Sequence, residues 1–224
     1  MTILEHIFEK CTNIKRIEIP PSIKVIGDFV FHACTQLRLR EVKLSEGLIN
    51  IGALAFFGDC EPLRHIEIPR TVRSIESCAF ARCTYLVEVK LCEGIESIGF
   101  HSFKKCMSLK SIEIPPTVRT IGIRAFEGCA SLEKITLPEG LEKISHTAFK
   151  SCTSIRHIKI PSTVTYFHWY AFYGCSQLLE VKSCNEIEDL LSRLSLLHEW
   201  RPYSSRFIYC CVRYSVPQRM GKIR

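Results

Sequence analysis

The chain has 224 residues and a formal net charge of +7, with 30 Lys and Arg residues against 23 Asp and Glu residues. Residues 199–224 hold six of the basic side chains and one acidic side chain, so this tail alone contributes +5 and the rest is nearly neutral. This distribution makes a nucleic-acid-binding role unlikely for the body of the chain. No run of about 20 apolar residues occurs, which disfavours a membrane-spanning helix.

One apolar pattern recurs along the chain from Ile3 to Val181. Each copy begins at a cysteine, and six of the seven spacings between these cysteines are 23 residues, whereas Cys34 to Cys60 is 26. These ladder cysteines are Cys11, Cys34, Cys60, Cys83, Cys106, Cys129, Cys152 and Cys175. Such self-similarity is the signature of a solenoid, in which each repeat covers the apolar edge of its neighbour. We number the repeats from the one that begins at Cys11.

The first residues form half a repeat. Ile3, Ile7 and Phe8 occupy the apolar positions that precede a ladder cysteine, and no strand-forming segment comes before them. An open solenoid end exposes apolar side chains and unpaired strand edges. This predicts either that the chain is a fragment of a longer array or that it self-associates through its N-terminal edge.

The fifth repeat illustrates the elements that each unit predicts. Residues Leu109–Ile114 alternate at the end of the segment and are rich in β-branched side chains, which indicates a strand. Pro115 ends this strand because proline has no N–H to donate. A turn and a second short extended segment then lead to Gly122, where a positive φ is expected because glycine recurs at this position. Ala125–Cys129 predicts a helical or 3₁₀ turn that inserts its phenylalanine into the core.

The repeats also alternate with a doubled period of 46 residues. Odd-numbered repeats read I-E-I-P-x-T or close variants, and even-numbered repeats read V-K-L-x-E-G or close variants. The exposed strand position therefore alternates in charge through Glu18, Lys43, Glu67, Lys90 and Glu113. Opposite charges on neighbouring strands avoid in-register repulsion, so we interpret them as keeping register and solubility. A charge code for a ligand is the alternative.

This unit resembles the BspA-like subclass of leucine-rich repeats, with the consensus C-x-x-L-x-x-I-x-I-P-x-x-V-x-x-I-G-x-x-A-F-x-x-C. The resemblance covers residues 3–181. It implies an α/β-type repeat solenoid, mostly β, forming a right-handed leucine-rich repeat superhelix. One parallel strand per 23-residue repeat would line the concave face, with a short second strand and a helical turn on the convex side. It further implies binding of other macromolecules without catalysis.

Two regions are expected from this pattern. Residues 1–184 form the solenoid, with half a repeat, seven full repeats and a partial eighth, and residues 185–224 form a capping helix and a basic tail. The segment NEIEDLLSRLSLLHEW starts with a capping-box-like Asn185 and Glu188 and carries leucines at helical spacing. It predicts a helix over 185–198 that covers the last coil.

The ladder cysteines predict a column of buried, unbridged thiols, which fits a reducing compartment. No cysteine pairing suggests zinc, and no nucleotide, metalloprotease or hydrolase motif occurs, so we expect no enzyme activity, no cofactor and no metal. The expected location is intracellular. The alternative is a cell-surface or secreted adhesion-type module, because BspA-like repeats are also associated with cell-surface proteins.

A basic stripe is the candidate binding site. The fourth residue after the ladder-cysteine position is basic in five of eight repeats, with the equivalent residue used in the longer second repeat. These residues are Lys15, Arg40, Arg64, Lys110 and Arg156. If the stripe faces the concave groove, it can meet an acidic protein surface; an ordinary solvated face is the alternative. The sequence thus predicts a non-catalytic protein-interaction scaffold.

Overall fold

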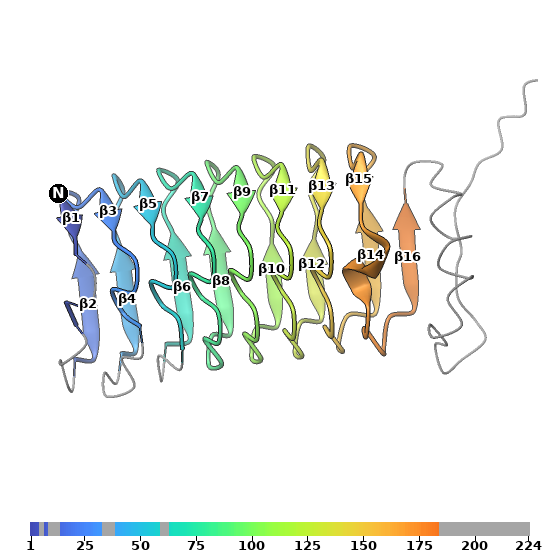
Figure 1. Ribbon diagram of the computed structural model, residues 1–224, viewed down its shortest axis with the longest axis horizontal. Coiled ribbons are helices and arrows are strands. Elements are labelled where there is room, and N and C mark those ends of the chain that lie inside the picture. Colours follow the sequence, from blue (N-terminus) through green and yellow to red (C-terminus); the bar gives the residue numbers. More distant parts are fainter. Residues whose placement is uncertain (5–6, 9–13, 33–38, 59–62, 184–224) are drawn as a thin grey trace, which may run out of the picture.

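The computed structural model describes residues 1–4, 7–8, 14–32, 39–58 and 63–183. The chain winds into an elongated solenoid whose coils, one per repeat, stack along a single axis (Figure 1). Its sheets are parallel, and within them neighbouring strands come from successive coils. The predicted capping helix over 185–198, the tail, and Cys11, Cys34 and Cys60 lie outside the described residues.

The longer strands lie along one side of the solenoid, which we call the long-strand face. Their bounds are β2 Arg16–Ile19, β4 Glu41–Leu44, β6 His65–Ile68, β8 Glu88–Leu91, β10 Ser111–Glu113, β12 Lys134–Thr136, β14 His157–Ile160 and β16 Glu180–Ser183. They pair as β2 with β4, as β6-β8-β10-β12, and as β14 with β16. Apolar side chains point inward and charged ones outward, as the alternating pattern predicts.

The shorter strands form one continuous eight-stranded parallel sheet in the order β1-β3-β5-β7-β9-β11-β13-β15. Their bounds are β1 Thr2–Ile3, β3 Val25–Ile26, β5 Asn50–Ile51, β7 Ser74–Ile75, β9 Ser97–Ile98, β11 Thr120–Ile121, β13 Lys143–Ile144 and β15 Tyr166–Phe167. The second, shorter strand of each unit is therefore confirmed. Thr2 and Ile3 already belong to this sheet, because they pair with Val25 and Ile26.

Turns connect each short strand to the next ladder cysteine, and we call this side the turn face. Among the described residues, only Trp169–Phe172 forms a 3₁₀ helix, η1. In other coils a residue of the turn has a positive φ, as in His101 (56°), Arg124 (55°) and Thr147 (53°). A left-handed residue interrupts helical geometry, so the predicted helical turn occurs in the last full coil and is replaced by tight turns elsewhere.

The positive φ expected at Gly122 was wrong. Positive φ values occur two residues later in the turn, on residues other than glycine, such as Arg124. Gly122 instead meets a steric demand, because a Cβ there would lie 2.8 Å from the backbone carbon of Gly99 and from the backbone oxygen of Ile98. Such an approach is closer than carbon atoms tolerate, so the glycine lets successive coils come together.

A column of phenylalanine rings runs through the core. Successive rings stack nearly parallel, with centroids 4.7–5.4 Å apart. The column contains Phe8, Phe31, Phe56, Phe80, Phe103, Phe126, Phe149 and Phe172. Burying a large apolar side chain contributes roughly 1.5–3 kcal/mol before chain entropy is subtracted. The column therefore makes stacking of the coils the main source of stability.

The ladder thiols stand beside this column. Cys83, Cys106, Cys129, Cys152 and Cys175 are buried and unbridged, as predicted. Each Sγ donates a hydrogen bond to the carbonyl oxygen of the core phenylalanine that lies 26 or 27 residues earlier in the chain, for example Cys106 to Phe80 at 3.1 Å. Burial raises the pKa of Cys175 to about 12. These cysteines thus satisfy a buried backbone acceptor as well as filling space.

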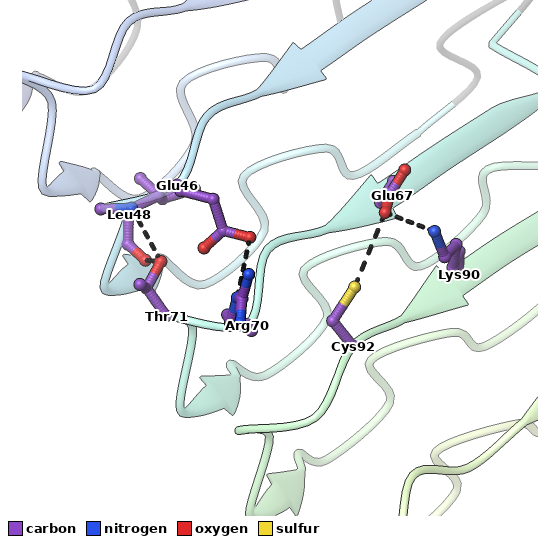
Figure 2. A network of polar contacts seen from close by, with 8 residues as sticks. Glu46, Leu48, Glu67, Arg70, Thr71, Lys90 and Cys92 are labelled. Carbon is purple, nitrogen blue, oxygen red and sulfur yellow. Dashed lines mark hydrogen bonds and ion pairs between the residues drawn. The ribbon is translucent and has the colours of Figure 1, made fainter.

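The doubled period corresponds to two kinds of boundary between coils. At the boundary from an even-numbered to an odd-numbered coil, a threonine hydroxyl accepts a hydrogen bond from a glycine N–H and donates one to the next carbonyl. The threonine–glycine pairs are Thr71–Gly47, Thr117–Gly94 and Thr163–Gly140. At odd-to-even boundaries, ion pairs such as Glu67–Lys90 join neighbouring long strands. Figure 2 shows both boundaries around coil three.

Candidate interaction surface

The predicted basic stripe lies at one edge of the long-strand face. Each of its five residues directly precedes a long strand, as Arg64 precedes β6 and Lys110 precedes β10. Lys15, Arg40, Arg64, Lys110 and Arg156 all have exposed side chains. None of them forms an ion pair with another residue that the structure describes. Within the described residues, the stripe therefore presents positive charge that no ion pair compensates.

Backbone hydrogen bonds fix this stripe in space from coil to coil. The Arg40 N–H donates to the Lys15 carbonyl at 2.8 Å, and the Val87 N–H donates to the Arg64 carbonyl at 2.8 Å. Val87, Glu133 and Leu179 occupy the same position in the remaining coils. The stripe is thus interrupted, with its densest positive charge over coils one to three.

The strands themselves carry paired charges. Arg16 Nε lies 2.7 Å from Glu41 Oε2, and Lys43 Nζ lies 2.6 Å from Glu18 Oε1. The side chains in these pairs are more than half exposed, so each pair contributes about 0–1 kcal/mol to stability. The predicted alternation of charge therefore produces ion pairs in which one positive and one negative side chain cancel each other's charge. Exposed charges without an ion pair among the described residues also occur within the strands, as at Lys134 and Lys159.

A shallow hollow of about 440 Å³ lies along β8 and β10, from the first residues of these strands to the turns that follow them. Glu88, Glu93 and Glu113 line it together with Pro115 and Pro116. The one lysine in the hollow, Lys90, is already paired with Glu67 at 2.6 Å. The hollow is therefore an acidic part of the long-strand face.

A charged cluster that the sequence did not predict lies on the turn face. Glu127 is only 15% exposed, and its carboxylate lies 3.0 Å from Lys104 Nζ, 3.5 Å from Lys150 Nζ and 3.8 Å from Arg124 Nε. Burial opposes ionisation of Glu127, but the Lys104 hydrogen bond and the surrounding cations lower its pKa overall. The four residues come from three successive coils, and their sequence positions become neighbours only when the coils stack.

Nothing in the described part of the chain resembles a catalytic or metal centre. No group of three or more His, Cys, Asp or Glu side chains there could hold a metal ion. His65 and His157 each contact a glutamate of the neighbouring strand, Glu88 and Glu180, at 3.2 and 3.4 Å. The same described residues contain no helix that has both the length and the apolar character needed to cross a bilayer.

Stacked parallel strands, one phenylalanine and one cysteine per coil, and tight turns in place of helices define the repeat. Residues 1–121 and 96–194 match the BspA type leucine rich repeat region, in six copies. The chain belongs to the BspA-type leucine-rich repeat family. The family that the consensus in the sequence resembled is therefore confirmed, together with its mostly-β parallel solenoid.

Solved structures of bacterial leucine-rich repeat proteins share this fold. A T. pallidum leucine-rich repeat protein is 32% identical, with a TM-score of 0.52 over 53% of this chain and 57% of that chain. A protein from Eubacterium ventriosum is 23% identical, with a TM-score of 0.59 over 71% of this chain and 42% of that one. A Bacteroides ovatus protein is 24% identical, with a TM-score of 0.51 over 82% and 57%.

The BspA-type chain spans about half the length of these solved structures. No curated protein matches it. The last two structures support the fold alone, because their identity to this chain is below 25%.

Proposed function

We propose that this BspA-type solenoid is a non-catalytic scaffold that binds an acidic protein on its long-strand face, along the basic edge formed by Lys15, Arg40, Arg64, Lys110 and Arg156. The observation that carries the proposal is the exposure of these five side chains without an ion-pair partner among the described residues. Uncompensated charge on an extended surface steers an oppositely charged protein during encounter.

The polarity of the face supports the same orientation. Glu88, Glu93 and Glu113 make the hollow between β8 and β10 acidic, so an acidic partner is repelled there and attracted to the coils where Lys15, Arg40 and Arg64 lie. Specific recognition needs such unfavourable contacts as well as favourable ones, because they exclude the wrong docking geometry.

A cell-surface setting fits this scaffold better than the intracellular one. The intracellular expectation rested on unbridged cysteines, yet the five described ladder thiols are buried, and each bonds to a backbone carbonyl. Buried thiols are shielded from oxidants, so their free state requires no reducing compartment. The chain matches the BspA-type family, and the resemblance to that family was the ground for the cell-surface alternative.

The test compares two sets of charge reversals in the whole chain used as bait. One variant carries Arg40→Glu, Arg64→Glu and Lys110→Glu, and its matched control carries Lys24→Glu, Arg73→Glu and Lys143→Glu around the short strands. Both lose the same charge, and all six side chains are exposed. We expect the first variant to lose an acidic partner that the wild type and the control retain. Equal retention by all three proteins would reject the basic edge as the binding site.

A further inference from the structure

The turn face of coils four to six carries apolar groups directly beside the Glu127 cluster. Phe100 is 43% exposed and Ile123 is 44% exposed, and they occupy the same position in successive coils. The His101 N–H donates to the Ile123 carbonyl at 3.0 Å, which fixes their spacing, and the Phe100 ring stacks on the His101 ring at 3.7 Å. Two large apolar side chains therefore stand in water next to a charged cluster.

The cluster has a surplus of positive charge. Lys104, Arg124 and Lys150 carry three positive charges against the single negative charge of Glu127, which leaves +2. Lys105 is exposed and has no ion pair with any described residue, so the surplus becomes +3. Burial, Lys104 and Arg124 lower the pKa of His101 below its usual 6.5, so this ring adds no charge at neutral pH.

These groups are only partly solvated, which makes their mutual repulsion stronger than at an open surface. The side chains of Lys104 and Lys150 are 26% and 33% exposed, and that of Arg124 is 41% exposed. A negatively charged group placed over Arg124 and Lys105 would relieve this repulsion. An apolar group placed over Phe100 and Ile123 would at the same time remove apolar surface from water.

We propose that the apolar–basic patch formed by Phe100, Ile123, Lys105, Arg124 and Lys150 docks an acidic peptide segment that carries apolar side chains among its carboxylates. This second surface lies on the turn face and is separate from the long-strand face. Charge complementarity selects the acidic groups of the segment, and the Phe100–Ile123 pair selects its apolar side chain.

The position of Glu127 favours a peptide over a dense polyanion. Its carboxylate sits in the middle of the basic groups, with Lys104 on one side and Lys150 on the other. A phosphate-rich surface would meet this carboxylate as well as the cations, whereas spaced carboxylates can contact Lys105 and Arg124 at the margin. The apolar part is also limited to two side chains, which suits a single segment.

The test uses the full chain and a fluorescent peptide of alternating glutamate and leucine, with binding followed by anisotropy. We expect saturable binding that weakens with added salt, and loss of binding when glutamine replaces glutamate or serine replaces leucine in the peptide. Phe100→Ser with Ile123→Ser, and Lys105→Gln with Arg124→Asn, should each weaken binding at least about tenfold, because each variant removes two contacts and one charge-assisted or apolar contact is worth about tenfold. Asparagine is chosen because it tolerates a positive φ.

Lys24→Gln with Arg73→Gln is the matched control and should bind as the wild type does. Lys105→Gln alone removes one exposed charge, so it tests the basic half of the patch even if another variant loses stability. The proposal is overturned if the wild type fails to bind the peptide, or if the patch variants bind as tightly as the control. It is also overturned if the patch variants lose binding to anionic lipid vesicles but still bind the peptide as the wild type does. The same conclusion follows if they lose self-association, measured by sedimentation, but still bind the peptide.

Discussion

The hydroxyl of Thr71 accepts a hydrogen bond at 3.0 Å from the backbone N–H of Gly47, a residue of the preceding coil. The same hydroxyl donates to the carbonyl of Leu48 at 2.6 Å (Figure 2). One side chain thus satisfies two backbone groups of a turn in the neighbouring coil. Thr117 and Thr163 repeat the arrangement at the next two even-to-odd boundaries.

Thr71→Val should therefore destabilise the solenoid by about 1–3 kcal/mol, because it leaves a partly buried N–H and a carbonyl without their partner. Thermal melting measures the loss. Thr136→Val makes the same chemical change at an exposed position of β12 and should stay within about 0.5 kcal/mol of the wild type. Equal melting temperatures for the two variants would show that the threonine hydroxyls do not hold the boundary.

Two glycines with positive φ should respond very differently to alanine. Gly94 has φ +125°, and a Cβ there would lie 2.0 Å from the carbonyl oxygen of Arg70, so we expect Gly94→Ala to cost about 3 kcal/mol or more. Gly128 has φ +75°, and its Cβ would lie 3.3 Å from Lys105 Cγ and at ordinary contact distances of 3.8 and 4.0 Å from the Lys105 backbone. Gly128→Ala should cost about 1–2 kcal/mol. Denaturant unfolding measures both, and similar losses would contradict the structural distinction.

The repeat itself was accessible to sequence reasoning because apolar spacing directly reports which side chains face the core. The strands, their parallel stacking and the inward Phe126 all follow from that spacing. The doubled period was also visible as alternating P-x-T and x-E-G turns. The structural reason for the doubled period was not predicted. The hydrogen bond that Gly47 N–H donates to the Thr71 hydroxyl joins two turns that become neighbours only when the coils stack.

Glycine positions show why backbone detail was harder to predict. Gly122 was expected to adopt a positive φ, but close packing against Gly99 explains the residue, and Arg124 has the left-handed conformation instead. A single sequence cannot separate these two uses of glycine. The basic stripe was predictable from one repeated position, whereas the cluster around Glu127 draws on different positions of three coils and has no sequence period.

The ladder thiols predict a loss of stability at alkaline pH. Burial raises the pKa of Cys175 from 9.0 to about 12, and that of Cys106 and Cys152 well above 9.0. The free energy of unfolding keeps its full value below pH 9.0, because the thiols are protonated in both the folded and the unfolded chain. It falls as pH rises from 9.0 toward the folded pKa values, because in this range only the unfolded chain releases these protons. Each thiol accounts for up to about 1.4 kcal/mol per pH unit in this range.

Melting temperature should therefore fall as pH rises above about 9, the ordinary thiol pKa, and Cys175→Ala should flatten this fall while lowering stability at neutral pH. Maleimide labelling provides an independent readout, since buried thiols with raised pKa values react slowly until the chain unfolds. Rapid labelling of Cys106, Cys129 and Cys152 in the native protein would contradict the buried column, as would a pH-independent melting temperature.

The central claim is that the basic edge of the long-strand face binds an acidic protein, and association kinetics test it most directly. With the captured partner immobilised, the variant carrying Arg40→Glu, Arg64→Glu and Lys110→Glu should associate at least about tenfold more slowly than wild type, with a weaker dependence on salt. Its dissociation rate should change less, and the control with reversals at Lys24, Arg73 and Lys143 should associate as the wild type does. Unchanged association of the Arg40, Arg64 and Lys110 variant, or equal slowing of the control, would contradict the account.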